Sequence, residues 1–206
     1  MADGAPVWGI IGGTGLTAIE TLVVEETLEP STVWGAPSAP LKIGRIGDQR
    51  VVFLARHGNP HRIPPHRVNY RANIEALRAA GVDRIIAVNA VGAMHSAMVP
   101  ASLVLPDQLI DYTWGRAPSF YEDNLESTVH VDFSWPYSET VRDALRNASA
   151  AAGVALHDGG VYACTQGPRL ETAAEITRLF GVVIEDIDGS LHFATRLRMR
   201  FTLLGG

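Results

Sequence analysis

The chain has very little cysteine, no long apolar run and no strongly basic segment. Cys164 is the only cysteine among 206 residues, so an internal disulfide is impossible and a reducing compartment is expected. No apolar run approaches the length of a membrane span, and the first residues lack the pattern of a signal peptide. The formal charge of −5, without basic runs that alternate with aromatics, argues against nucleic-acid binding. We therefore expect a cytoplasmic protein that binds neither nucleic acid nor membrane.

The length and the apolar patterning indicate one domain over residues 1–206. Hydrophobic residues make up 47% and charged residues 19%, which suits a globular protein with a real core. Short apolar runs predict strands, and helical spacing with capping residues predicts helices. The expected strands cover residues 7–11, 41–46, 50–55, 84–88, 103–105 and 160–165, and the expected helices cover residues 68–80, 138–152 and 171–179. The fold class expected is α/β, with a central mixed β-sheet flanked by helices.

A cationic stretch follows one of these buried strands directly. Three arginines and three histidines lie within residues 54–70, and Arg56 and His57 stand where the apolar run ends. Arginine offers a rigid fork of donors to a phosphate, and histidine adds a donor. The stretch therefore predicts an anion pocket. The alternative is a surface loop whose arginines pair with carboxylates.

Two other strands end in small or polar residues that suit the same purpose. The first expected strand ends in a glycine turn, Gly12–Gly15, in which backbone N–H groups and the Thr14 hydroxyl can face one anion. The G-x-G-x-x-G pattern fails at Ala18, so a plain tight turn stays open. Asn89 follows a third strand and could equally be an ordinary turn residue. Because ligands gather beyond strand carboxyl ends in open α/β sheets, we expect these segments to converge.

The remaining reactive residues give weaker indications. His57, His61 and His66 do not form a zinc-binding pattern, so no metal is expected. His130 lies in a polar and aromatic stretch that suits a surface loop or a subunit contact, although a buried structural histidine is equally compatible. Cys164 falls inside an expected strand and suits a packed small hydrophobe better than a nucleophile.

Several motifs follow one another in a distinctive order along the chain: Gly9–Gly15, Arg56–Gly58, Val68–Asn73, Val88–Gly92, Gln108–Thr113 and Tyr162–Thr172. In this order they resemble the methylthioadenosine phosphorylase branch of the purine nucleoside phosphorylases and, within it, the bacterial S-methyl-5′-thioinosine phosphorylases. The resemblance covers roughly residues 7–179.

The resemblance implies roles for individual positions. The phosphate-binding positions of the family correspond here to Thr14, Arg56, His57, Asn89 and Ala90. The remaining positions would contact the nucleoside: His61 near the phosphate and sugar, Leu170 and Glu171 beside the purine, and His130 at the nucleoside of a neighbouring subunit in a homotrimer.

The implied reaction is phosphorolysis of a 5′-methylthio-purine nucleoside, with S-methyl-5′-thioinosine favoured, to the free purine and 5-methylthioribose 1-phosphate. Inorganic phosphate is then a co-substrate, and no cofactor is expected. Two alternatives stay open: a general purine nucleoside phosphorylase, and a catalytically impaired phosphorylase-like binding protein.

Residues 180–206 depart from the family pattern, and we expect an atypical or truncated C-terminal part. The family's Asp or Asn that meets the base lies in the segment without a counterpart here. Residue chemistry alone therefore does not choose between a 6-oxo and a 6-amino purine, and the preference for the 6-oxo base rests on the resemblance.

Overall fold

A computed structural model describes residues 5–95, 98–122, 125–183 and 200–205. Most of the segment that departs from the family pattern, residues 184–199 and 206, lies outside the described residues. Within the described part, no helix is long and apolar enough to cross a membrane.

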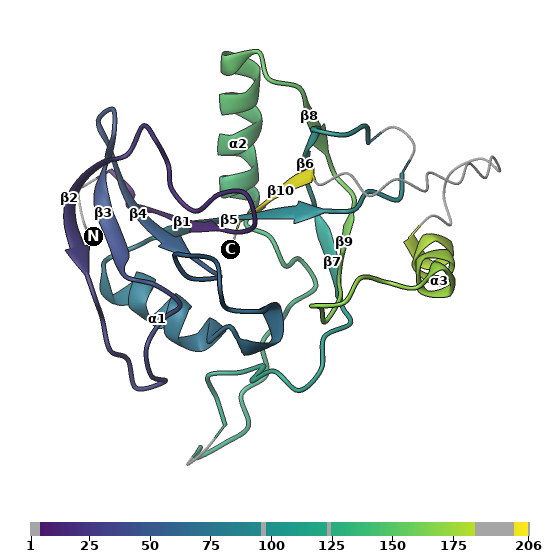
Figure 1. Ribbon diagram of the computed structural model, residues 1–206, viewed down its shortest axis with the longest axis horizontal. Coiled ribbons are helices and arrows are strands. Elements are labelled where there is room, and N and C mark those ends of the chain that lie inside the picture. Colours follow the sequence, from purple (N-terminus) through teal and green to yellow (C-terminus); the bar gives the residue numbers. More distant parts are fainter. Residues whose placement is uncertain (1–4, 96–97, 123–124, 184–199, 206) are drawn as a thin grey trace.

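An eight-stranded mixed sheet crosses the described part of the molecule in the order β2-β3-β4-β1-β5-β10-β6-β8 (Figure 1). Its strands are β1 (Trp8–Gly12), β2 (Val23–Leu28), β3 (Leu41–Ile46), β4 (Gln49–Ala55), β5 (Arg84–Val91), β6 (Leu103–Leu105), β8 (Leu156–Asp158) and β10 (Arg200–Gly205). A smaller parallel pair is formed by β7 (Gln108–Asp111) and β9 (Val161–Cys164).

The centre of the large sheet is parallel and its first edge is antiparallel. Strand β1 pairs in parallel with both β4 and β5, whereas β3 pairs antiparallel with β2 and β4. Strands β3 and β4 form a hairpin, and Gly47 in its turn has a φ of +57°, which glycine adopts without strain. Strands β4, β1 and β5 therefore end at the same edge of the sheet.

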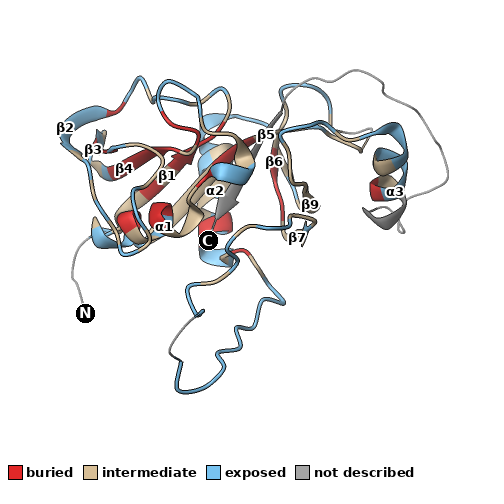
Figure 2. Cartoon of the chain, turned by 60° about the horizontal axis from the view of Figure 1, so that its bottom comes forward, coloured by how far each residue is buried: buried red, intermediate tan, exposed pale blue. Residues whose placement is uncertain are grey.

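Helix α1 (Tyr70–Ala79) covers the apolar side of this region. The Asn69 side chain caps it by accepting a hydrogen bond from the Ala72 amide at 3.1 Å. Ala76 and Leu77 pack into a buried cluster with residues of β1, β3 and β4, such as Leu54. Figure 2 shows that buried residues concentrate in these strands and on the inner side of α1. This packing fixes the start of α1 relative to the ends of the central strands.

Two further helices complete the predicted arrangement. Helix α2 (Glu139–Ala152) begins at the expected cap, Ser138, and contacts β8. Helix α3 (Ala173–Val183) lies at the far side of the molecule from β2 (Figure 1). A short 3₁₀ helix, η1 (Pro65–Arg67), precedes α1. The predicted fold class, a mixed sheet flanked by helices, is confirmed.

Candidate functional site

The register of the central strands brings three predicted segments together. Gly12 at the end of β1 is paired with Ala55 of β4 and with Val88 of β5. The residues that follow these partners are the glycine turn, Arg56 and Asn89, so all three segments begin at one level of one sheet edge. Because this edge is the carboxyl end of parallel strands, it is where an α/β sheet places a ligand.

Gly13 allows the Arg56 guanidinium to lie against the turn. A Cβ on Gly13 would come within 2.4 Å of Arg56 Nη2 and within 2.4 Å of the Val88 carbonyl oxygen. Any other residue would therefore displace the guanidinium or separate the strand ends. The Arg56 amide also donates to the Gly12 carbonyl at 2.9 Å, which fixes the start of the side chain.

His57 is buried and held at both ring nitrogens. Its Nδ1 lies 2.7 Å from the Ile63 carbonyl oxygen, and its Nε2 lies 3.3 Å from Arg56 Nε, which is a donor. These contacts require a proton on Nδ1 and a lone pair on Nε2, which is the neutral tautomer. Burial lowers the pKa of His57, and the positive charge of Arg56 lowers it further against the opposing effect of the Ile63 carbonyl. His57 is therefore neutral near pH 7 and orients the Arg56 side chain.

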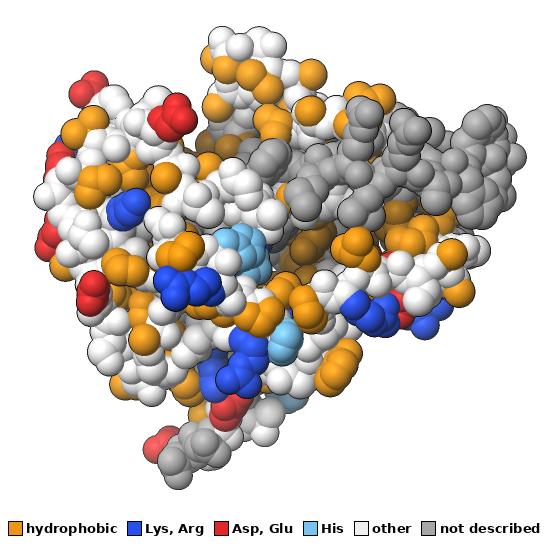
Figure 3. Space-filling view, viewed as in Figure 1, with side chains coloured by type: hydrophobic (Ala, Val, Ile, Leu, Met, Phe, Trp, Pro, Cys, Tyr) orange, Lys and Arg blue, Asp and Glu red, His pale blue; other side chains and the backbone are white. Residues whose placement is uncertain are grey.

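A cavity of about 400 Å³ opens beside this pair. The rings of His57 and His61 stack 4.5 Å apart and nearly parallel, which places His61 at the same cavity. Figure 3 shows histidine, arginine and apolar side chains gathered near the centre of this face of the molecule. The full lining is Thr14, His57, His61, Arg62, Ile63, Pro64, Pro65 and Pro168.

The charge of this region is not neutralised by acidic side chains. Among the described residues, no carboxylate lies within ion-pair distance of Arg56, Arg62 or Arg67. Burial lowers the pKa of Arg56, the direction expected for a cation that is removed from water without an acidic partner. The alternative of a surface loop with paired arginines is therefore not what the described part of the chain shows.

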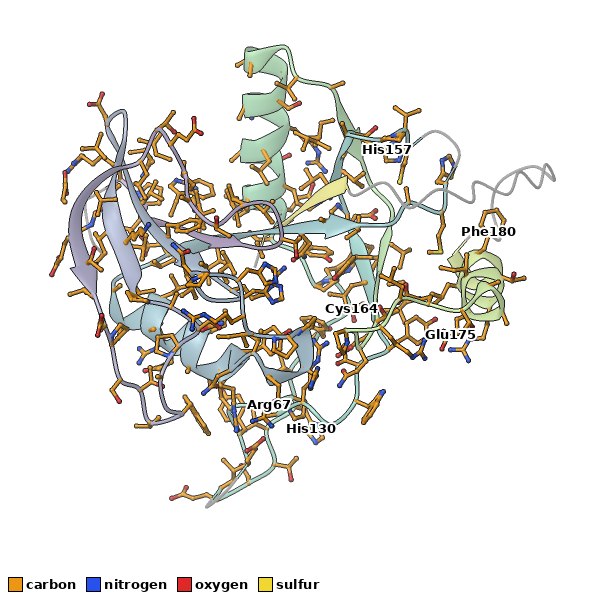
Figure 4. All side chains as sticks on the ribbon, in the orientation of Figure 1. Arg67, His130, His157, Cys164, Glu175 and Phe180 are labelled. Carbon is orange, nitrogen blue, oxygen red and sulfur yellow. The ribbon has the colours of Figure 1, made fainter. Side chains whose placement is uncertain are left out.

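Not every predicted site residue lines the cavity. Asn89 is buried in β5 and Ala90 is half-buried beside it, both at the strand end rather than in the lining. Leu170 is 61% exposed and Glu171 is half-buried, a few residues past Pro168 in the cavity wall. His130 is exposed on the long loop between β7 and α2, here called the β7–α2 loop (residues 112–138) (Figure 4).

The proline wall of the cavity is the part that sequence reasoning missed. Ile63, Pro64, Pro65 and Pro168 line it, although Pro168 is about a hundred residues away along the chain. The prolines of the first segment were recognisable as stiff elements. Nothing local in the sequence indicates that Pro65 and Pro168 share one cavity.

Comparison with known proteins identifies the family. Residues 8–190 match the family model described as the phosphorylase superfamily. The chain belongs to the phosphorylase superfamily. This membership confirms the resemblance drawn from the motifs and the predicted enzyme class, a phosphorylase.

Individual relatives cover most of the chain. The "probable S-methyl-5′-thioinosine phosphorylase" of Pseudomonas syringae is 57% identical over 173 residues, which is 84% of this chain and 70% of that protein. The "6-oxopurine nucleoside phosphorylase" of Pyrococcus furiosus is 43% identical over 190 residues, covering 89% and 70% of the two chains. The crystal structure of methylthioadenosine phosphorylase from Schistosoma mansoni matches with a TM-score of 0.82 and 31% identity, covering 86% of this chain and 70% of that one.

Proposed function

We propose that this phosphorylase cleaves a 5′-methylthio-purine nucleoside, S-methyl-5′-thioinosine in preference, to the free purine and 5-methylthioribose 1-phosphate. The observation that carries the proposal is that Arg56, which has no acidic partner among the described residues and is not itself in the cavity lining, lies directly behind the cavity-lining residues His57 and Thr14. A relative named for this substrate is 57% identical over most of the chain, which supports the choice of nucleoside. The donors at the strand ends support the role of phosphate as co-substrate.

Phosphate would bind where the donors converge. The Thr14 hydroxyl, the Arg56 guanidinium and the backbone N–H groups of the glycine turn supply hydrogen bonds to its oxygens. His57 keeps the guanidinium oriented, because its Nε2 accepts from Arg56 Nε while its Nδ1–H donates to the Ile63 carbonyl. Asn89, at the same level of the sheet, would add an amide contact. The nucleophile is thereby held in place before reaction.

Cleavage then requires little covalent participation by the protein. A phosphate oxygen forms a bond to the anomeric carbon while the bond from that carbon to the purine nitrogen breaks. The electron pair goes to the purine nitrogen, and the sugar passes through a cationic, oxocarbenium-like state. The purine takes up one proton through solvent, which balances the proton that hydrogen phosphate loses when it becomes the sugar phosphate. The adjacent phosphate stabilises that positive charge, and the fixed donors keep the phosphate in position.

A second candidate substrate is a 6-oxopurine nucleoside without the methylthio group. The relative from Pyrococcus furiosus, named 6-oxopurine nucleoside phosphorylase, supports this alternative at 43% identity. Both candidates share a 6-oxo purine, so the preference for that base over a 6-amino purine has support from two kinds of relative. The 5′ substituent is what separates the candidates.

We further propose that the chain assembles in the cytoplasm as a homotrimer in which His130 reaches the nucleoside of a neighbouring subunit. The β7–α2 loop that carries His130 exposes large aromatic side chains, including Trp114 at 72% and Trp135 at 80%. Contacts between copies would cover such side chains, which are enriched at protein interfaces. The single cysteine suits a reducing compartment.

A product assay tests the reaction. The purified chain is incubated with S-methyl-5′-thioinosine, with and without inorganic phosphate, and hypoxanthine is measured by chromatography. We expect hypoxanthine only with phosphate, together with an equal amount of 5-methylthioribose 1-phosphate. Inosine and methylthioadenosine run in parallel: faster turnover of inosine would favour the second candidate, and faster turnover of methylthioadenosine would reverse the base preference. A folded chain that converts none of these nucleosides would support the binding protein instead.

A further inference from the structure

Arg116 connects two segments of the cavity wall through hydrogen bonds. Its Nη1 donates to the Tyr70 hydroxyl at 3.0 Å, and that hydroxyl donates to the Pro65 carbonyl at 2.9 Å. On the other side, Nη2 donates to the Gln166 carbonyl at 2.9 Å and Nε donates to Gln166 Oε1 at 3.1 Å. The Arg116 guanidinium therefore holds both Pro65, the first residue of η1, and Gln166, two residues after the end of β9.

The two segments also touch directly, which closes a ring. Gly167 follows Gln166, and a Cβ on Gly167 would lie only 3.1 Å from Pro65 Cγ. Its φ of +58° adds a second reason for glycine at this position. Pro65 and the next residue, Pro168, both line the cavity. The separation of these two prolines is therefore fixed by contact on one side and by Arg116 on the other.

Arg116 is itself held in place by the same glutamine. The Gln166 side chain donates to the Trp114 carbonyl at 2.8 Å and accepts from the Trp114 amide at 3.3 Å, which pins the loop two residues before Arg116. In the described part of the chain, no carboxylate lies within ion-pair distance of Arg116. Its partners are neutral acceptors and the Tyr70 ring, whose centroid lies 5.2 Å from Cζ. A lysine has no planar fork that could reach these acceptors together.

In the described part of the chain, the phosphate-binding residues share no hydrogen bond with this ring of contacts. Burial is the main cause of the lowered pKa of Arg56, and the charge of Arg116 is only a minor influence on it. Arg56 is fixed by the Gly12 carbonyl and by His57, and His57 is fixed by Ile63. The amides of Arg62 and Ile63 both donate to the His57 carbonyl at 2.9 Å, which closes that loop locally. Loss of Arg116 should therefore loosen the proline wall and leave the anion site in place.

We propose that Arg116 is a positioning residue for the nucleoside: by tying Tyr70 and Pro65 to Gln166 and Pro168, it sets the width of the cavity in which the nucleoside lies. This inference rests on the proposed function, because it assigns the anion site to phosphate and the remaining cavity to the nucleoside. It predicts that loss of Arg116 impairs the use of the nucleoside and not the use of phosphate.

The test compares Michaelis constants for the two substrates in four variants. Arg116→Ala should raise KM for S-methyl-5′-thioinosine by about tenfold or more, because a small displacement of a substrate-positioning wall carries a cost of this order. KM for phosphate should change by less than about twofold, since the charge of Arg116 is only a minor influence on Arg56. Arg116→Lys and Tyr70→Phe should shift the nucleoside KM in the same direction. The double variant Arg116→Ala/Tyr70→Phe should be no worse than Arg116→Ala, because both changes break one network. Arg84→Ala is the matched control, since it removes a guanidinium 5.5 Å from the Trp8 ring at the opposite end of β1 and β5.

The contrary outcomes are equally specific. An unchanged nucleoside KM in Arg116→Ala, a parallel rise in both KM values, or additive losses in the double variant would overturn the proposal. If Arg116→Ala does not fold, Tyr70→Phe and Arg116→Lys decide by the same criteria.

Hydrogen exchange provides a readout that needs no turnover. The Arg67 amide donates to the Pro64 carbonyl at 2.9 Å and the Val68 amide to the Pro65 carbonyl at 3.4 Å, so both report on η1. We expect these amides to exchange faster in Arg116→Ala than in the unmodified chain, and equal rates would overturn the positioning role. If the unmodified chain turns over no nucleoside, the proposed function fails, and the exchange rates still decide whether Arg116 holds the wall.

Discussion

Replacement of Arg56 should separate phosphate binding from stability. Arg56→Met keeps an apolar stem of similar length and removes the guanidinium. In the described structure this cation lies against Gly13 without a carboxylate partner, and burial lowers its pKa. Removing a partly buried charge that has no acidic partner relieves its desolvation cost, and the lost hydrogen bond to His57 offsets part of that gain, so the midpoint of thermal unfolding without phosphate should stay the same or rise.

Phosphate binding should weaken strongly in the same variant. Hydrogen bonds to a charged group contribute about 1.5–3 kcal/mol, which corresponds to a rise of about 10–150-fold in the dissociation constant for phosphate. Isothermal calorimetry measures that constant directly. Thermal unfolding at increasing phosphate concentrations measures it independently, because a ligand stabilises the folded state in proportion to the logarithm of its concentration over Kd.

Arg45→Met is the control for this experiment. Arg45 lies on β3, is about half exposed and pairs with Glu25 at 3.3 Å, away from the cavity. The control should keep its response to phosphate. Unchanged phosphate affinity in Arg56→Met would refute the anion site, and a large loss of stability without phosphate would refute the argument that this cation is unfavourable in the empty fold.

Three further predictions follow from other features. Burial lowers the pKa of His57 below its ordinary 6.5, so the unfolded chain binds this proton at a higher pH than the folded chain does. The free energy of unfolding should therefore fall as pH drops below about 6.5 towards the folded pKa. Urea unfolding at several pH values should show a smaller loss of stability in His57→Gln. Asp158 accepts hydrogen bonds from Arg142 at 2.6 Å and from Arg146 at 2.7 Å. Asp158→Asn should therefore lower the free energy of unfolding by about 1–2 kcal/mol in urea titrations. A loss below about 0.3 kcal/mol would show that this partly exposed cluster contributes little to stability. Light scattering at micromolar concentration should give the mass of a trimer, and a monomer would contradict the assembly proposed for the β7–α2 loop.

The central strands and their ends could be predicted because each is a short apolar run closed by a distinct residue. Val51–Ala55 is almost entirely buried in β4, and Arg56 follows it at once. The end of β1 is marked in the same way by its glycine turn. Since parallel strands share a carboxyl edge, the convergence of Arg56 and Thr14 follows from the pattern without any long-range information.

Strand β2 gave no comparable pattern. It is an edge strand whose residues face solvent, with Val23 at 68% and Val24 at 46% exposed. Glu25 and Glu26 interrupt any alternation of apolar and polar residues, and a register shift between Val24 and Glu26 disturbs the pairing with β3. Pairing to an existing strand, and not burial, holds β2 in the sheet, so its own composition carries little information.

The cavity wall could not be predicted because its contacts join distant segments. Pro65 meets Gly167, and Arg116 joins Tyr70 to Gln166, across separations of about fifty to a hundred residues. No local propensity specifies such contacts. They arise because the β7–β9 pair brings the chain after Cys164 back beside η1.

A comparison with Arg142 gives a separate argument that the site is built for an anion. Among the described residues, the buried Arg142 is neutralised by Glu139 and Asp158, whereas the arginines that lack a carboxylate partner away from the cavity, such as Arg50 and Arg178, are exposed. The chain carries a formal charge of −5, so acidic residues are not scarce. Yet Arg56, which lies beside the cavity-lining His57 and is partly buried, has no acidic partner among the described residues: the Nε2 of that neutral histidine, the glycine turn and the side chains of Tyr70 and Tyr162 surround it. Folding alone would favour a carboxylate at that place, and a carboxylate there would occupy the donors that phosphate needs. The lack of a carboxylate partner makes the charge of Arg56 unfavourable in the fold without a ligand, and it leaves the guanidinium donors available to a bound anion.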